Sequence, residues 1–261
     1  SDMKHTTAFQ NPLKPFRALA MLASLFIAFG LGACQKDTPP TDPDVIVVGY
    51  DADTLVLQGN TVRYLALGDS YTIGESVPEA ERWPNQLVDS LRARNAGTVW
   101  NDAAIVATTG WTTTNLSNGM DAAQVDTATW DLVSLLIGVN NQYQGLPVDD
   151  YANEFSALLD RAVSLTGGRS DRVFVVSIPD YGYTPFGASN QSSISAALQT
   201  FNDTCLARTQ AAGIAHFNIT PISQQHPDTP GLVAPDGLHP SGLQYSLWVE
   251  SFVAGVQELV E

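Results

Sequence analysis

The sequence predicts an α/β domain built on a doubly wound, parallel β-sheet. From residue 63 onward, short apolar runs alternate with longer amphipathic segments, which is the pattern of βαβ units. Gly, Pro, Asn and Thr gather where the apolar runs end, as is typical of loops. The 261 residues, 44% of them hydrophobic, are enough for one domain of this class with a sizeable core. A second catalytic domain is not expected.

The expected elements follow the chain in βαβ order. Five strands are predicted at residues 64–68, 98–106, 131–138, 172–178 and 215–219, the second of them broken. Helices are predicted at residues 84–95, 149–166, 192–212 and 241–260. A proline opens the first helix, and Asp149 and Asp150 favour the positive end of the second helix dipole. In doubly wound sheets ligands bind at the carboxyl ends of the strands, so functional residues are expected just after each strand.

The first 33 residues have the composition of a removable leader. Ser1 and Asp2 precede Met3 and are interpreted as residues added for expression. A basic region precedes an apolar run at residues 18–32, which is typical of a secretory signal and short for a spanning helix. The run ends in Leu31-Gly32-Ala33-Cys34, which resembles the bacterial lipobox. That resemblance implies a lipid on Cys34 and an extracytoplasmic domain anchored to a bacterial membrane, with the outer membrane as a guess; the alternative is a plain signal peptide with a chance cysteine.

Residues 34–61 are predicted to be a lipidated tether followed by a short β lead-in. Residues 35–44 are rich in Pro, Asp and Thr, the composition of a solvated spacer. The β-type runs at residues 45–48 and 54–57 favour a hairpin at the edge of the main domain, which is assigned to residues 62–261.

Charge and cysteine content narrow the classes of partner. The formal net charge is -15, so the surface repels polyanions and no nucleic-acid partner is expected. With only Cys34 and Cys205, no structural disulfide is expected, and Cys205 is interpreted as a small buried hydrophobic residue. We find no His-Glu-x-x-His, P-loop or dinucleotide glycine motif, so no metal or cofactor is expected.

Two motifs contain the residues of a nucleophilic site. Gly68-Asp69-Ser70 follows the first predicted strand at a sharp turn that exposes a serine. Near the C-terminus, Asp236 precedes His239 by three residues on a loop shaped by glycine and proline. A carboxylate at that spacing can bond one ring nitrogen and leave the other for a serine, which needs such a base because its own pKa is too high.

Candidate oxyanion donors follow the next two strands. Gly110 lies in a Thr-rich loop after the second strand, and Asn140 follows the third. A backbone amide and a side-chain amide are neutral donors, each worth about 3 to 4 kcal/mol toward a tetrahedral oxyanion. Trp111, beside Gly110, and the loop at residues 179–186 after the fourth strand, with Tyr181 and Tyr183, are candidates for a substrate-pocket wall.

Taken in order, Gly68-Asp69-Ser70, Gly110, Asn140 and the Asp236–His239 pair resemble the four blocks of the SGNH, or GDSL-type, hydrolases. The resemblance implies the family's three-layer α/β/α, flavodoxin-like fold. It also implies Ser70 as nucleophile and first oxyanion donor, Gly110 and Asn140 as further donors, His239 as general base and Asp236 as its orienter. Two positions depart from the pattern: Tyr71 replaces a leucine, and Asn141 stands where the family often has an aspartate.

The function expected from these residues is serine ester hydrolysis through an acyl-enzyme. Short-chain acyl or acetyl esters, including carbohydrate esters, are slightly preferred as substrates. Lysophospholipase, thioesterase and acyltransferase activities use the same residues and remain open. An alternative from another class is a surface lipoprotein that binds ligands without catalysis.

Overall fold

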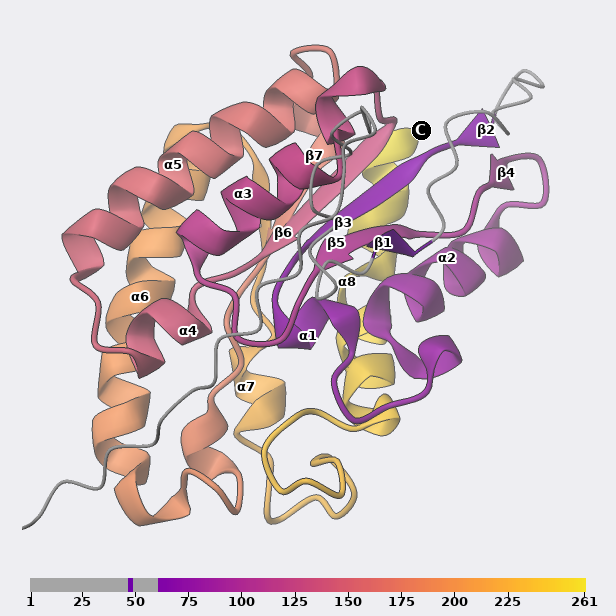
Figure 1. Cartoon of the computed structure of the whole chain (residues 1–261). Helices are drawn as coiled ribbons and strands as arrows, with labels where there is room; N and C mark the ends of the chain where they lie inside the picture. The colour runs from indigo at the N-terminus through magenta and orange to yellow at the C-terminus, as the bar shows by residue number, and fades with distance from the viewer. Residues whose placement is uncertain (1–46, 49–60) are drawn as a thin grey trace, which may run out of the picture. The chain divides into compact units, whose positions relative to one another are not determined.

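The computed structural model describes residues 47–48 and 61–261, and a sheet of parallel strands forms the centre of the latter range (Figure 1). Its order is β5-β3-β6-β7-β8, and these five strands are mutually parallel. β1 (Val47–Val48) pairs antiparallel with the β5 edge. The predicted five-stranded parallel sheet is therefore confirmed. The strand bounds are β3 Tyr64–Gly68, β5 Ala104–Ala107, β6 Leu132–Leu136, β7 Val173–Val176 and β8 Ala215–Phe217.

The order of the strands determines where a site can form. The chain starts the parallel sheet at β3, crosses to β5 on one side, and then returns to β6 on the other. Helices that follow neighbouring strands therefore diverge to opposite faces above the carboxyl end of β3, which opens a crevice there. β3, β5 and β6 are buried along their whole length, as expected for strands covered on both faces.

Helices cover both faces of this sheet and complete the predicted three-layer α/β/α fold. Figure 1 shows α3, α5 and α6 over one face, and α2 and α8 over the other. The aromatic rings of Trp83 (α2), Phe174 (β7) and Phe252 (α8) lie with centroids 6.0 to 6.4 Å apart and join the second helix layer to the sheet. The helix bounds are α2 Trp83–Arg94, α3 Thr113–Ala122, α5 Val148–Leu165, α6 Gln191–Ala211 and α8 Gly242–Val260.

Most predicted elements are confirmed within a few residues. The break predicted in the second strand separates β4 (Val99–Trp100) from β5, and β4 pairs with β2 (Thr61–Val62) in a small parallel sheet. Prediction missed α3 and the short helices, for which a loop was expected. The short helices are α1 Ser70–Ile73, α4 Val139–Tyr143 and α7 Thr220–Ser223.

Several predictions concern the N-terminal region. The leader, the lipobox cysteine Cys34, the spacer and the second strand of the predicted hairpin lie outside the described residues. In the part of the chain that is described, no helix combines the length and the apolar character needed to cross a membrane.

Candidate active site

Ser70 is the first residue of α1, directly after the carboxyl end of β3. The turn is tight: a Cβ added to Gly68 would lie 2.1 Å from Thr72 Oγ1 and 2.5 Å from the Leu136 carbonyl oxygen, so only glycine fits. At the first helical position the backbone amide of Ser70 has no acceptor within the helix and points out of its end. The strand and the turn thus present both the hydroxyl and the amide of Ser70 at the crevice.

Asp69 caps α1 from beneath the nucleophile. Its Oδ1 accepts the Tyr71 amide at 3.0 Å, and the side chain is fully buried. Burial raises the pKa of Asp69 to about 7, although hydrogen bonds to backbone amides, including those of Tyr71 and Gly138, oppose the rise. The residue before Ser70 therefore changes its charge near neutral pH.

The structure brings Asp236 and His239 into direct contact. His239 Nδ1 lies 2.6 Å from Asp236 Oδ2, and the other oxygen, Oδ1, accepts the amides of Leu238 and His239 at 2.9 and 3.0 Å. Because an ionised carboxylate can only accept, Nδ1 carries the proton and Nε2 is an acceptor. The carboxylate thus fixes both the tautomer and the orientation of the imidazole.

Ser76 makes a further contact with this pair that sequence reasoning missed. Its Oγ donates a 2.6 Å hydrogen bond to Asp236 Oδ2, across 160 positions of sequence. Its backbone is left-handed, with φ of 66°, an unusual conformation for a non-glycine residue. Partial burial by itself raises the pKa of Asp236, but the bonds from Ser76, Leu238 and His239 outweigh it and hold that pKa below its ordinary value.

The two predicted oxyanion donors come from neighbouring segments. Gly110 has φ of +86°, and no heavy atom lies within 4 Å of the position a Cβ would take, so the space on that side of the residue is open. Asn140 lies in α4, and its Nδ2 donates one hydrogen to the Trp111 carbonyl at 2.9 Å. That bond orients the side-chain amide and leaves its second hydrogen available.

A cavity of about 260 Å³ contains most of these groups. Tyr181 also lines it, whereas Trp111 and Tyr183 are not among its lining residues. The Trp111 indole occupies the space over Gly119 of α3, where an added Cβ would lie 2.1 Å from its Cη2. Trp111 therefore contributes its carbonyl rather than its ring. The lining residues are Ser70, Tyr71, Thr109, Gly110, Val139, Asn140, Tyr143, Tyr181, Phe186, Leu238 and His239.

Three aromatic side chains gather on one side of this cavity. The ring centroids of Tyr143, Tyr181 and Phe186 lie 6.2 to 6.3 Å apart, with interplanar angles of 46° to 70°. Tyr143 and Phe186 are 61% and 51% exposed, unusual for side chains of this size. The Tyr181 hydroxyl bonds Gln142 Oε1 at 3.0 Å and fixes the inner ring. Phe186 belongs to the predicted wall loop at residues 179–186, whereas sequence reasoning missed Tyr143 as a pocket residue.

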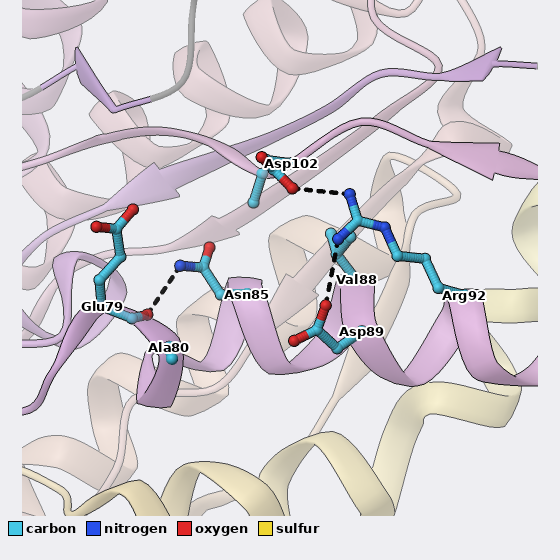
Figure 2. A pocket seen from close by; sticks show the side chains of 8 residues that line it. Glu79, Ala80, Asn85, Val88, Asp89, Arg92 and Asp102 are labelled. Atoms are coloured by element: carbon cyan, nitrogen blue, oxygen red, sulfur yellow. Dashed lines mark hydrogen bonds and ion pairs between the residues drawn. The ribbon is translucent and has the colours of Figure 1, made fainter.

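A larger cavity of about 380 Å³ lies beside α2 and has a different chemical character. Figure 2 shows Arg92 reaching between Asp89 and Asp102, with the Asn85 amide bonded to the Glu79 backbone oxygen. Its one cationic side chain is thus already paired with two carboxylates, and the described residues that line it include no serine, cysteine or histidine. The smaller cavity is therefore the candidate active site.

The described residues also bear on cysteine and metal chemistry. Cys205 is buried as predicted, and burial raises the pKa of its thiol to about 12, so it is inert at neutral pH. Over residues 47–48 and 61–261, no cluster of three or more His, Cys, Asp or Glu side chains has the arrangement of a metal site.

The chain resembles known proteins in sequence and in fold. Residues 66–247 match the GDSL-like Lipase/Acylhydrolase family. TesA superposes with a TM-score of 0.61 at 16% identity, over 76% of this chain and 99% of that chain. The psychrotrophic esterase EstA from Pseudoalteromonas sp. gives 0.58 at 17%, over 77% and 98%. Axe2, an acetylxylan esterase from Geobacillus stearothermophilus, gives 0.59 at 16%, over 76% and 94%. No curated protein sequence matches the chain.

Proposed function

The chain belongs to the GDSL-like lipase/acylhydrolase family, and we propose that it is a serine carboxylesterase for small, uncharged acyl or acetyl esters. Membership makes it an ester-hydrolysing enzyme. The assignment of residues and substrate is supported by one observation above all: Ser70, Gly110, Asn140 and His239 line a single cavity.

His239 acts as the general base in the proposed reaction. Its Nε2 accepts the Ser70 proton as Oγ attacks the ester carbonyl, and then returns it to the leaving alcohol. Asp236 stabilises the imidazolium because its carboxylate stays ionised, at a pKa below the ordinary range. Water repeats the sequence on the acyl-enzyme and releases the acid.

Three neutral donors stabilise the tetrahedral oxyanion in this mechanism: the Ser70 amide, the Gly110 amide and Asn140 Nδ2. Removal of one donor of this kind costs about 10²- to 10³-fold in kcat. The Asn140 donor is held before substrate arrives, because Trp111 already binds its other hydrogen. Little reorganisation is therefore needed as the negative charge develops.

The cavity supports a small and uncharged substrate. Its volume of about 260 Å³ lies at the lower end for ligand sites, for which about 300–1,000 Å³ is usual. Among the described residues that line it, His239 is the only ionisable side chain apart from tyrosines, and the acidic surface of the protein disfavours anionic esters. EstA and Axe2, which share the fold, are an esterase and an acetylxylan esterase.

A lipolytic or thioesterase-type activity on longer acyl chains is the second candidate. The exposed rings of Tyr143 and Phe186 favour it, because they extend an apolar surface beyond the cavity.

We further propose that the domain acts outside the cytoplasm, anchored through lipidated Cys34. Loss of membrane association in Cys34→Ser tests that proposal, and retention by the variant contradicts it.

Hydrolysis of p-nitrophenyl esters of graded chain length, beside the Ser70→Ala variant, tests the proposed function. Activity that falls with chain length and disappears in Ser70→Ala supports a small-acyl serine esterase. Activity that rises with chain length supports the lipolytic candidate instead. Activity undiminished in Ser70→Ala contradicts the assignment of the nucleophile, and absence of ester hydrolysis in the wild type favours the ligand-binding alternative.

A further inference from the structure

Three side chains from three segments form a hydrogen-bonded chain behind the oxyanion donors. Asn141 Nδ2 donates to Thr113 Oγ1 at 2.7 Å, and Thr113 Oγ1 in turn donates to Glu154 Oε2 of α5. Asn141 Oδ1 accepts the Thr113 backbone amide at 3.1 Å. Asn141 and Thr113 are each 1% exposed, so water does not compete for the two bonds between them, whereas Glu154 is only partly buried.

The donor and acceptor roles of Asn141, Thr113 and Glu154 follow from the chemistry of their groups. The Thr113 amide is only a donor, so it must meet the oxygen of the Asn141 side chain. The Asn141 nitrogen therefore faces the Thr113 hydroxyl, which accepts it and has one proton of its own to give. The Glu154 carboxylate takes that proton. With an amide at position 141 and an acceptor at position 154, every group has its complement.

The hydrogen bonds between Asn141 and Thr113 join the two segments that contain the proposed oxyanion donors. Asn141 directly follows Asn140, and Thr113 lies three residues after Gly110. The bond from Asn140 Nδ2 to the Trp111 carbonyl is a second link between the same segments. The Thr113 amide is also the first amide of α3, one of those that a helix leaves without an internal partner. The buried side chain of Asn141 thus accepts the first amide of α3 and connects the two segments.

We propose that Asn141 is a positioning residue for ester hydrolysis, acting with Glu154 through Thr113 to hold Gly110 and Asn140 at the spacing of the oxyanion. The inference rests on the proposed function, because it assigns a role to groups that support the same site. Asn141 does not touch the reacting atoms. Its effect is on the alignment of donors that act most strongly in the transition state, and so it falls on kcat rather than KM.

Exchange of the amide at position 141 with the carboxylate at position 154 tests the proposal. In Asn141→Asp, the new carboxylate and that of Glu154 compete for the single hydroxyl proton of Thr113. One of the two carboxylates is left without a donor, and the two negative charges repel each other. In Asn141→Asp combined with Glu154→Gln, the hydroxyl donates to Asp and accepts from the new amide, so the chain is complete in the opposite direction. Glu154→Gln alone retains an acceptor oxygen. Thr209→Val removes another buried threonine hydroxyl, bonded to the Cys205 carbonyl within α6, and is the matched control.

The readouts are kcat and KM for a p-nitrophenyl ester, with the melting temperature of each variant. The expected result for Asn141→Asp is a fall in kcat of about 10- to 100-fold with KM within about threefold, since small misplacements of reacting groups have effects of this size. The double variant is expected to recover to within about threefold of wild type, and Thr209→Val to keep its kcat.

Two results overturn the proposal while leaving the esterase intact. One is an unchanged kcat in Asn141→Asp; the other is a double variant that does not fold or does not recover. If Asn141→Asp alone does not fold, recovery in the double variant still supports the proposal. A wild-type enzyme without Ser70-dependent ester hydrolysis contradicts the proposed function and this inference together.

Discussion

Ser76 Oγ lies 2.6 Å from Asp236 Oδ2, the same oxygen that binds His239 Nδ1. A serine on the loop after α1 thus completes the hydrogen bonding of a carboxylate 160 positions away. The left-handed backbone of Ser76 has a conformational cost, which makes its position informative about function. This bond joins the loop that follows Ser70 to the loop that contains His239.

Replacement of Ser76 by alanine should therefore lower activity without removing the reacting groups. We expect kcat for p-nitrophenyl acetate to fall about 3- to 10-fold, because a charge-assisted hydrogen bond that helps to orient Asp236 is lost. Ser156→Ala is the control, since Ser156 bonds only a backbone carbonyl within α5. Equal activities in the two variants would show that the contact has no catalytic role.

The buried carboxylate of Asp69 predicts an unusual pH dependence of stability. Its pKa is raised from about 3.9 when unfolded to about 7 in the folded protein, so the folded state holds the proton more tightly. Asp69 therefore contributes its full stabilisation below about pH 4. As the pH rises from there through about 7, the free energy of unfolding falls by up to about 4 kcal/mol.

Urea unfolding of the wild type and Asp69→Asn between pH 4 and 8 measures this effect. The free energy of unfolding of the wild type should fall relative to that of the variant as the pH rises across this range. A constant difference between the two proteins would mean that Asp69 titrates at its ordinary pKa.

Gly110→Ala separates backbone strain from catalysis. Gly110 and Gly168 have φ of +86° and +87°, and neither has a heavy atom within 4 Å of an added Cβ. Alanine should therefore destabilise both sites equally, by about 1 kcal/mol. Only Gly110→Ala should lower kcat, by about tenfold or more, because relief of the strain would move the residue 110 amide, which we propose as an oxyanion donor. Parallel loss or parallel retention of activity in the two variants would contradict that role.

The aromatic group formed by Tyr143, Tyr181 and Phe186 should control substrate selection. Phe186→Ala is expected to lower kcat/KM about 3- to 10-fold for esters whose apolar group reaches the ring, with little change for acetate esters. Tyr181→Phe, which keeps the ring and loses only the bond to Gln142, is the matched control. A loss that is uniform across chain lengths would indicate a general structural effect.

The sequence was sufficient for the elements with strong local signals. Parallel strands such as β3 and β6 are continuous apolar runs, and α5 and α8 are long enough for helical periodicity to show. The four-residue helix α1 and the five-residue helix α4 are shorter than any window that reveals periodicity. They were missed for that reason.

The candidate site likewise contains residues that local sequence patterns predict and residues that they do not. Ser70, Gly110 and Asn140 follow strand ends, and Asp236 and His239 are close in sequence, so local patterns were enough to single them out. Ser76 meets Asp236 only through the packing of distant loops. Trp111 packs its ring over Gly119, and Tyr143 contacts Phe186 on one side of the cavity. Such long-range contacts leave no periodic trace in the sequence.

Covalent labelling of the folded protein with a fluorophosphonate, followed by peptide mass spectrometry, tests the central assignment most directly. The account predicts one adduct, on Ser70, which forms far more slowly in a folded His239→Ala variant because the hydroxyl then lacks its base. An adduct on another residue, or equal rates of labelling in wild type and His239→Ala, would contradict the proposed active site.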